Sequence, residues 1–134
     1  MKYLLDTNIC IYIIKQKPPE VIQRFKSLLP TEIGVSSITT AELEYGIYKS
    51  TNIAKNREAL NQFLLPLEVL DFKVEATQAY GQLRADLSLK GLVIGAMDML
   101  IAAQALSQAL ILVTNNTSEF SRISRLSLEN WANQ

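Results

Sequence analysis

The chain has 134 residues, of which 49% are hydrophobic and 19% charged, with 13 basic and 13 acidic side chains. This composition is enough for one compact domain with a sizeable core and excludes a disordered chain. The net charge of zero gives no support to a protein that simply coats phosphates, and the absence of histidine excludes the Ser-His-Asp triad and most zinc sites.

Runs of apolar residues at strand or helix spacing alternate along the chain. In order, they predict a strand over 3–5, a helix over 9–14, a helix from 19 to about 29, a strand over 33–36, a helix from about 39, a helix capped by Asn52, a strand over 67–70, a helix over 74–90 with Gly91 as its C-cap, a helix from 96, a strand over 109–113, a short helix from 119 and an edge strand over 126–128. This alternation indicates an α/β fold with a central, mostly parallel sheet flanked by helices. We expect a single domain over 1–134 with its core over about 2–128.

Two pairs of residues have the spacing of a helix capping box. Thr39 with Glu42, and Asn116 with Glu119, each place an acid three residues after a polar side chain. We therefore expect a helix to begin near each pair, with the acid in its first turn. Further along the first of these helices, Tyr45 and Tyr48 are interpreted as packing residues.

Four acids share one local context, because each follows a predicted strand or opens a predicted helix. They are Asp6, Glu42, Asp98 and Glu119. The carboxyl ends of parallel strands meet at one edge of a sheet, so these acids can gather there. Helix capping alone accounts for any one of them, since a helix N-terminus stabilises a carboxylate by ~0.3–1 kcal/mol.

The set of four requires more than capping. Several carboxylates in one place repel each other, and Asp98 heads a strongly apolar helix, where an uncompensated charge is costly. A divalent cation removes this conflict, and oxygen-only ligands suit Mg²⁺ or Mn²⁺. Such an ion activates water and neutralises charge in phosphodiester hydrolysis. Three or four carboxylates are enough to hold one or two ions.

The remaining composition indicates where the protein works. Cys10 is the only cysteine, so no intrachain disulfide forms, and we expect a buried thiol in a reducing, cytoplasmic location. Asp6 and Asn8 interrupt any early apolar run, so no signal peptide is expected. No apolar stretch approaches the roughly 18 residues that cross a bilayer. Trp131 is expected to anchor the C-terminal segment by packing.

Several motifs, in this order and spacing, carry a resemblance to a known family. They are Leu4-Leu5-Asp6-Thr7-Asn8-Ile9, the stretch 36–39 leading to Glu42-Leu43-Glu44-Tyr45-Gly46, the stretch 94–102 around Asp98, and the stretch 113–120 followed by Leu128-Glu129-Asn130-Trp131. With them, nearly the whole chain resembles a PIN-domain ribonuclease, specifically the VapC-type toxin of a VapBC toxin–antitoxin pair. The resemblance implies a single PIN-like domain.

The resemblance also implies roles for the acids. Asp6, Glu42 and Asp98 match the family's metal-binding and catalytic positions. Many members carry a further acid just after the last buried strand. In this chain Asn116 stands near that place and Glu119 is the nearest acid. Glu119 is therefore a fourth catalytic candidate, with Asn116 as its alternative.

Polar neighbours of these acids are expected to hold them or to position the substrate. They are Thr7, Asn8, Thr114, Asn115 and Asn116. Arg84 is the best candidate for a contact with RNA phosphates, and solvated surface charge is the competing interpretation. The same two interpretations apply to Lys90, Arg122 and Arg125. Tyr45 and Tyr48 remain packing residues rather than platforms for RNA bases.

The function implied by the resemblance is a Mg²⁺- or Mn²⁺-dependent endoribonuclease that inhibits translation by cutting structured RNA. Transfer RNA is the expected substrate class, with initiator tRNA as a candidate. The implied partners are a cognate VapB-type antitoxin and a second copy of the chain, as a homodimer within a larger toxin–antitoxin assembly, without a membrane.

Rival classes remain open from the residues alone. A receiver-like phosphoacceptor domain also combines α/β alternation with a metal and an acidic pocket, although it would have paired acids after the first strand and a lysine after a late strand. Here Asp6 is followed by Thr7, and no lysine follows the strand that ends at Val113. A non-catalytic interaction module, whose acids only cap helices, and a nuclease directed at DNA are two further rival classes.

Overall fold

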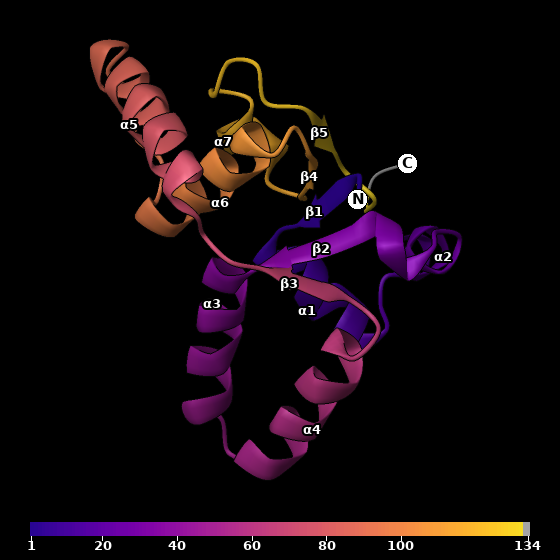
Figure 1. Ribbon diagram of the computed structural model, residues 1–134. Coiled ribbons are helices and arrows are strands. Elements are labelled where there is room, and N and C mark those ends of the chain that lie inside the picture. The colour runs from indigo at the N-terminus through magenta and orange to yellow at the C-terminus, as the bar shows by residue number, and fades with distance from the viewer. Residues whose placement is uncertain (133–134) are drawn as a thin grey trace.

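The computed structural model describes residues 1–132, so the last two residues of the predicted 1–134 domain lie outside it. Strands and helices follow each other along the whole chain (Figure 1). In order, they are β1 (Tyr3–Leu5), α1 (Thr7–Lys15), α2 (Pro19–Lys26), the 3-10 turn η1 (Pro30–Glu32), β2 (Ile33–Ser36), α3 (Ser37–Tyr48), α4 (Ile53–Leu64), β3 (Glu68–Leu70), α5 (Val74–Leu89), α6 (Ala96–Ser107), β4 (Ile111–Val113), α7 (Thr117–Phe120) and β5 (Leu128–Glu129).

The five strands form one sheet in the order β3-β2-β1-β4-β5, and all four pairings are parallel. The prediction of a mostly parallel sheet is confirmed, whereas the order of the strands could not be predicted from the sequence. β1 lies at the centre, with Leu5 opposite Val35 of β2 on one side and Val113 of β4 on the other. The segments that follow these three strands therefore emerge side by side at one edge of the sheet.

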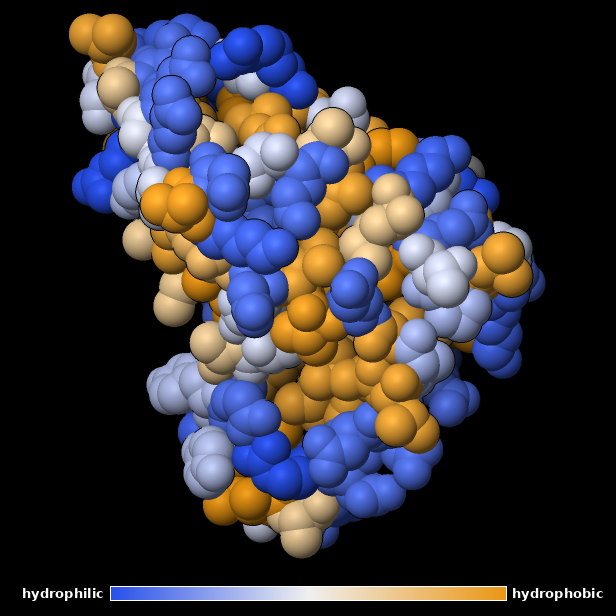
Figure 2. Space-filling view, viewed as in Figure 1, coloured by the Kyte–Doolittle hydropathy of each residue, from blue (hydrophilic) through white to orange (hydrophobic). Residues whose placement is uncertain are grey.

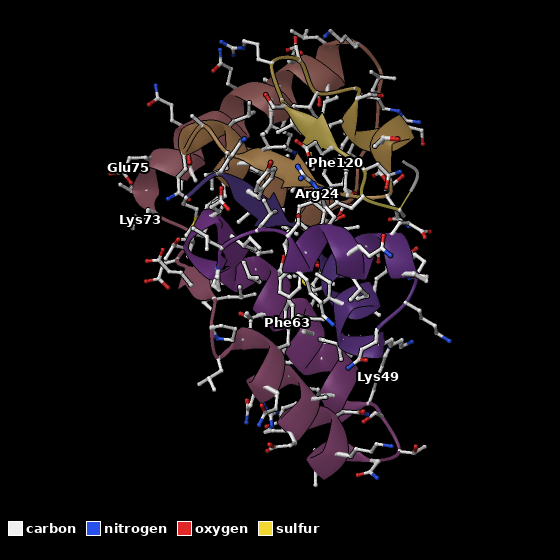
Figure 3. All side chains as sticks on the ribbon, turned by 90° about the vertical axis from the view of Figure 1, so that its right-hand side faces the viewer. Arg24, Lys49, Phe63, Lys73, Glu75 and Phe120 are labelled. Carbon is white, nitrogen blue, oxygen red and sulfur yellow. The ribbon has the colours of Figure 1, made fainter. Side chains whose placement is uncertain are left out.

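Alternate residues of the central strands point to opposite faces of the sheet, and each face has its own buried cluster. Tyr3 and Leu5 belong to the cluster covered by α1 to α4, whereas Leu4 belongs to the cluster covered by α5, α6 and α7. Phe63 lies in the first cluster and Phe120 in the second (Figure 3). Because both faces are covered, the central strands are apolar at nearly every position.

α5 ends in a turn at Gly91, after which the chain leads into α6. Gly91 adopts a positive φ of 69° there. Its N–H donates to the Ser88 carbonyl at 3.1 Å, and the N–H of Leu92 donates to the Leu87 carbonyl at 2.9 Å. These paired bonds form a Schellman motif and confirm the predicted helix end at Gly91. The chain then reverses, so that α6 packs back along α5 (Figure 1).

A buried glutamine ties α6 to two strands on the other side of the sheet centre. Gln104 is 1% exposed, and its Nε2 donates to the carbonyls of Leu70, at 3.0 Å, and Asp71, at 3.2 Å. The hydroxyl of Ser36 donates to its Oε1. The side chain thus satisfies polar groups where β2 and β3 end, and it fixes α6 against them.

Several boundaries differ from the prediction: α7 begins at Thr117 rather than at 119, and β4 and β5 are Ile111–Val113 and Leu128–Glu129 rather than 109–113 and 126–128. For two further helix boundaries the structure shows the reason. The helix predicted to reach about Leu29 ends at Lys26, because Leu29 precedes Pro30 and takes an extended conformation. α3 begins at Ser37 rather than near Thr39, since Ser36 is the N-cap and accepts the N–H of Ile38 at 3.0 Å. The capping box predicted for Thr39 and Glu42 is therefore wrong.

The prediction that Tyr45 and Tyr48 pack in the interior is also wrong. Their side chains are 68% and 67% exposed, respectively. Lys49 Nζ lies 4.8 Å from the centroid of the Tyr45 ring, and Arg57 Cζ lies 5.3 Å from that of Tyr48. The buried side of α3 is supplied instead by Thr39, Leu43 and Ile47.

Other predictions are confirmed. Asn52 caps α4, with its Oδ1 accepting the N–H of Lys55 at 3.1 Å. Cys10 is fully buried. Trp131 is also fully buried and packs edge-on against Tyr3, with ring centroids 5.6 Å apart, so it anchors the C-terminal segment. Within residues 1–132, no helix is long and apolar enough to cross a membrane.

Candidate active site

Asp6 stands at the carboxyl end of the central strand, where it caps α1. It is 3% exposed. Its Oδ1 accepts the backbone N–H of Thr7 at 2.8 Å, and its Oδ2 accepts the hydroxyl of Thr114 at 2.8 Å. Helix capping therefore describes part of what Asp6 does. However, the bond from Thr114 also ties it to the end of β4, which lies 108 residues away in the sequence.

Glu42 reaches the same edge from α3. Its Oε1 accepts the hydroxyl of Thr7 at 2.7 Å, and the same hydroxyl lies 3.5 Å from that of Thr39. Glu42 is in the second turn of α3, where the backbone N–H groups already bond to helix carbonyls. Capping therefore does not explain this acid, and Thr7 links it to the residue next to Asp6.

Asp98 lies in the first turn of α6, as predicted. In the part of the chain that the structure describes, its carboxylate makes no hydrogen bond and no ion pair. Its position therefore depends on the backbone that leads into α6. Gly95 is the N-cap there, and a Cβ added to Gly95 would lie 3.7 Å from Asp98 Oδ2.

Glu119 is held by two donors that the predicted capping arrangement does not include. Its Oε1 accepts the N–H of Gly95 at 3.2 Å, and its Oε2 accepts the side-chain amide of Asn116. Asn116 is the N-cap residue of α7 but makes no side-chain capping bond, so the capping role predicted for this pair is wrong. The backbone N–H of Asn116 donates instead to the Thr114 hydroxyl at 3.0 Å.

The four carboxylates lie within electrostatic reach of one another. Burial raises the pKa of Asp98 to about 6, and the charges of Asp6, Glu119 and Glu42 contribute to this increase. Burial also raises the pKa of Asp6, against hydrogen bonds from Thr114 and Thr7 that lower it, and the charges of Glu42 and Glu119 add to the increase. Among residues 1–132, none of the four forms an ion pair with a lysine or arginine.

The donor set fits a hard divalent cation in its chemistry, since all four side chains offer carboxylate oxygens. In their present conformations, no three His, Cys, Asp or Glu side chains of the described residues converge on one point that could hold an ion. Thr7 holds Glu42, and Gly95 and Asn116 hold Glu119. Ligation by these two glutamates therefore requires their side chains to turn towards Asp6 and Asp98.

A polar chain of three side chains lies beside the acids. Asn8 Nδ2 donates to Asn115 Oδ1 at 3.4 Å, and Asn115 Nδ2 donates to the hydroxyl of Tyr12 at 2.6 Å. Tyr12 was missed by the sequence reasoning, although it stands one helical turn after Asn8 and so shares its face of α1. The structure thus brings together all the predicted polar neighbours, and their roles in substrate positioning remain predictions.

Arg84 is exposed on α5, and its guanidinium donates to the hydroxyl of Tyr80 in the preceding turn. Among the described residues, no hydrogen bond or ion pair links it to the four acids, so its predicted role towards RNA also remains a prediction.

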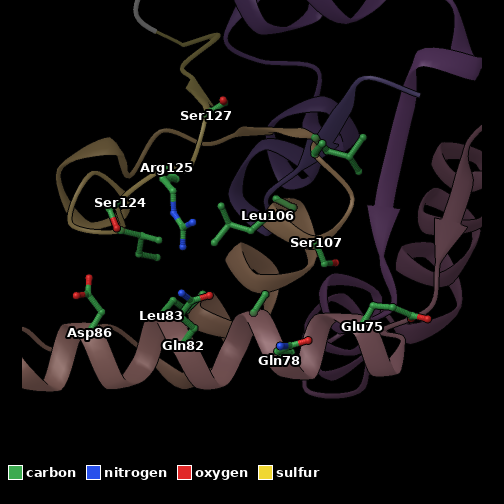
Figure 4. Close-up of a pocket in the computed structure, with 15 residues that line it drawn as sticks. Glu75, Gln78, Gln82, Leu83, Asp86, Leu106, Ser107, Ser124, Arg125 and Ser127 are labelled. Atoms are coloured by element: carbon green, nitrogen blue, oxygen red, sulfur yellow. The ribbon is translucent and has the colours of Figure 1, made fainter.

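A groove of about 820 Å³ lies elsewhere, between α5, the end of α6 and the segment before β5 (Figure 4). Its lining includes Gln82, Leu106 and Arg125 but none of the four acids. We place the candidate active site at the acidic edge rather than in this groove, because the groove lacks a convergent set of reactive groups.

In the metal-free protein we expect the free energy of unfolding to fall by about 1 kcal/mol between about pH 4 and pH 6.5, with the effect reduced because Asp98 is only half-buried. The pKa of Asp98 is about 6 in the folded chain against an ordinary 3.8. The stabilisation by the bound proton is therefore complete below the unfolded pKa and is lost as the pH rises through the folded pKa. Thermal unfolding in EDTA measures the difference. Asp98→Asn should flatten this dependence, and an unchanged slope in that variant would contradict the assignment.

A family model described as "PIN domain" matches residues 3–126, which span all four acids of the edge and the whole parallel sheet except β5. Ribonuclease VapC2 of Rickettsia felis is 46% identical over 132 residues, which cover 98% of each chain. The tRNA(fMet)-specific endonuclease VapC of Shigella flexneri is 42% identical over 132 residues, covering 98% of this chain and 99% of the relative.

A solved structure gives the same result in three dimensions. The crystal structure of VapBC2 from Rickettsia felis, bound to a DNA fragment from its promoter, contains a chain that superposes with a TM-score of 0.92 at 46% identity. The superposition covers 98% of this chain and 99% of the other. The chain belongs to the PIN domain family and, within it, to the VapC ribonucleases. The receiver-like domain and the non-catalytic module are not favoured.

Proposed function

We propose that the chain is the toxin of a VapBC-type pair, a Mg²⁺- or Mn²⁺-dependent endoribonuclease that cuts structured RNA and so inhibits translation. The observation that carries the proposal is the gathering of four carboxylates from distant segments, without a cationic partner among the described residues. The name of the Shigella flexneri relative, a tRNA(fMet)-specific endonuclease, supports initiator tRNA as the candidate substrate.

Asp6, Glu42 and Asp98 would hold the metal, and Glu119 or Asn116 would complete the site. Bound there, a divalent ion would lower the pKa of the attacking water and neutralise charge on the scissile phosphate. Hydrogen bonds hold Asp6 in place, whereas Glu42 would turn away from Thr7 to reach the ion. Thr7 and Thr114 each donate to one carboxylate oxygen of Glu42 and Asp6, respectively, which leaves further lone pairs on these oxygens free.

The amides of Asn8 and Asn115 are placed to position the substrate. Asn115 is oriented by Tyr12 on one side and by Asn8 on the other. Asn8 is exposed next to the acids, and its amide has a second N–H free to meet a phosphate or sugar oxygen. These contacts would orient RNA without reading its sequence.

A VapB-type antitoxin is the proposed partner, within an assembly that contains a homodimer of this chain. Solved relatives are VapBC complexes, including one from Salmonella typhimurium bound to DNA. Figure 2 supports a protein partner, because apolar side chains gather in a hollow between α3 and α4. Exposed apolar surface of this kind marks interaction sites on proteins that otherwise carry polar surfaces.

The direct test is cleavage of purified initiator tRNA, elongator tRNA and DNA of the same sequence, each with Mg²⁺, with Mn²⁺ and with EDTA. We expect cleavage of initiator tRNA with either ion, at least about 10²-fold faster than with EDTA. Calorimetry with Mn²⁺ alone measures binding of the ion independently of turnover.

Each other outcome selects a different function. Cleavage that persists in EDTA would refute the dependence on a metal. Preferential digestion of DNA would favour the DNA-directed nuclease, and cutting of both tRNAs at equal rates would refute initiator specificity while preserving ribonuclease activity. Absence of Mn²⁺ binding together with absence of cleavage would favour a non-catalytic module.

A further inference from the structure

The segment that carries Glu119 holds the loop that leads into α6. Arg122 Nη1 donates to the carbonyl of Val93 at 2.9 Å, and Glu119 Oε1 accepts the N–H of Gly95 at 3.2 Å. The two backbone groups lie on either side of Ile94. Glu119 and Arg122, whose side chains bond to these two groups, are three residues apart in the chain. They lie on one side of the turn formed by α7 and the residues that follow it.

Apolar contacts reinforce these two bonds. Ile94 is 5% exposed and belongs to the buried cluster that also contains Phe120 and Ile123. The apolar residues of the segment thus pack in the same cluster as Ile94, while its charged residues bond to the backbone on either side. We call the contacts of Arg122 and Glu119 with residues 93–95 the clasp.

The clasp determines where Asp98 stands. Gly95 is the N-cap of α6, and its carbonyl accepts the N–H of Met99 at 3.0 Å. Asp98 makes no side-chain hydrogen bond of its own within residues 1–132, so only the backbone of this first turn fixes its carboxylate relative to Asp6. A loosened loop at Val93 would therefore move a proposed metal ligand that no side-chain hydrogen bond restrains within residues 1–132.

We propose that Arg122 is a positioning residue, which fixes the start of α6, and with it Asp98, by holding the carbonyl of Val93. This role differs from the contact with RNA phosphate that an exposed arginine also suggests. The hydrogen bond from the guanidinium to the backbone carbonyl is present in the free protein and orders the loop there. A phosphate contact, by contrast, forms only when RNA is bound. The inference rests on the proposed function for its Mn²⁺-binding and catalytic readouts.

The test compares Arg122→Ala and Arg122→Lys with Arg125→Ala, a change at an arginine three residues further along that makes no hydrogen bond to the loop among the described residues. We expect Arg122→Ala to weaken Mn²⁺ binding by about tenfold in the absence of RNA, as loss of a group that orients a metal ligand does. It should lower kcat by a similar factor with KM unchanged. Arg122→Lys should retain most of both, and Arg125→Ala should bind Mn²⁺ as the parent does.

Amide hydrogen exchange provides a readout that needs neither metal nor turnover. In Arg122→Ala, the N–H groups of Gly95 and Met99 should exchange several-fold faster than in the parent and in Arg125→Ala. If the parent neither binds Mn²⁺ nor cuts RNA, the proposed function fails while this measurement still tests the clasp. Unchanged exchange and Mn²⁺ affinity, with a raised KM and a weaker salt dependence, would overturn the inference in favour of a phosphate contact.

Discussion

Replacing Asp98 by asparagine should reduce RNA cleavage by at least about 10³-fold, because a bound metal ion stabilises the transition state by several kcal/mol. The fold should stay intact. Asparagine has the same shape but lacks the charge that the ion needs. The Asp98 side chain makes no hydrogen bond within the described residues, so the change breaks no hydrogen bond of the folded chain. Cleavage rates under single-turnover conditions and circular dichroism measure the two effects.

A matched control separates the site from a general effect of lost charge. Asp86→Asn removes an acid of α5 that lines the separate groove and, among the described residues, pairs with Lys90 alone, at 3.0 Å, so it should leave cleavage unchanged. Asp6→Asn should be as inactive as Asp98→Asn. If Asp98→Asn retains more than about a tenth of the parent rate, Asp98 is not a metal ligand.

Replacing Gln104 by methionine should lower the free energy of unfolding by about 2–4 kcal/mol, because buried polar groups lose their partners. Methionine fills a similar volume, so the cost arises from hydrogen bonding rather than from a cavity. The carbonyls of Leu70 and Asp71 would lose their donor, and the hydroxyl of Ser36 would lose its acceptor. Denaturant unfolding measures the change.

Gln108→Met is the control for this prediction. Gln108 ends the same helix but is exposed, and its replacement should change stability by no more than about 0.5 kcal/mol. Equal stabilities of the two variants would show that the Gln104 network contributes nothing net. Because Gln104 connects α6 to the ends of β2 and β3, we also expect the Gln104→Met variant to lose more activity than the control.

Features that depend on near neighbours could be predicted from the sequence. The apolar run 3–5 before Asp6 indicated a buried strand ended by an acid, and the structure has both. Asp98 was placed in the first turn of an apolar helix for the same reason. Gln104 was overlooked, although a polar residue inside the run from Met99 to Leu106 was a signal for a buried hydrogen-bonding role.

Features that depend on distant partners could not be predicted in this way. The three-residue spacings around Glu42 and Glu119 are compatible with capping, and only the tertiary structure showed that the donors are Thr7 for the first and Gly95 and Asn116 for the second. Similarly, the helical positions of Tyr45 and Tyr48 indicated packing, but both side chains are exposed in the folded chain.

The sequence by itself determined that the chain folds as an α/β domain and that its acids follow strands or open helices. Periodicity and apolar runs depend on residues close together in the chain, so they can be recognised from the sequence without a structure. The tertiary structure decided the order β3-β2-β1-β4-β5, which places the ends of β1, β2 and β4 side by side and lets the charges of Asp6, Glu42, Asp98 and Glu119 act on one another. It did so because strand pairing and side-chain hydrogen bonds are set by distances in space, which residue spacing along the chain does not encode.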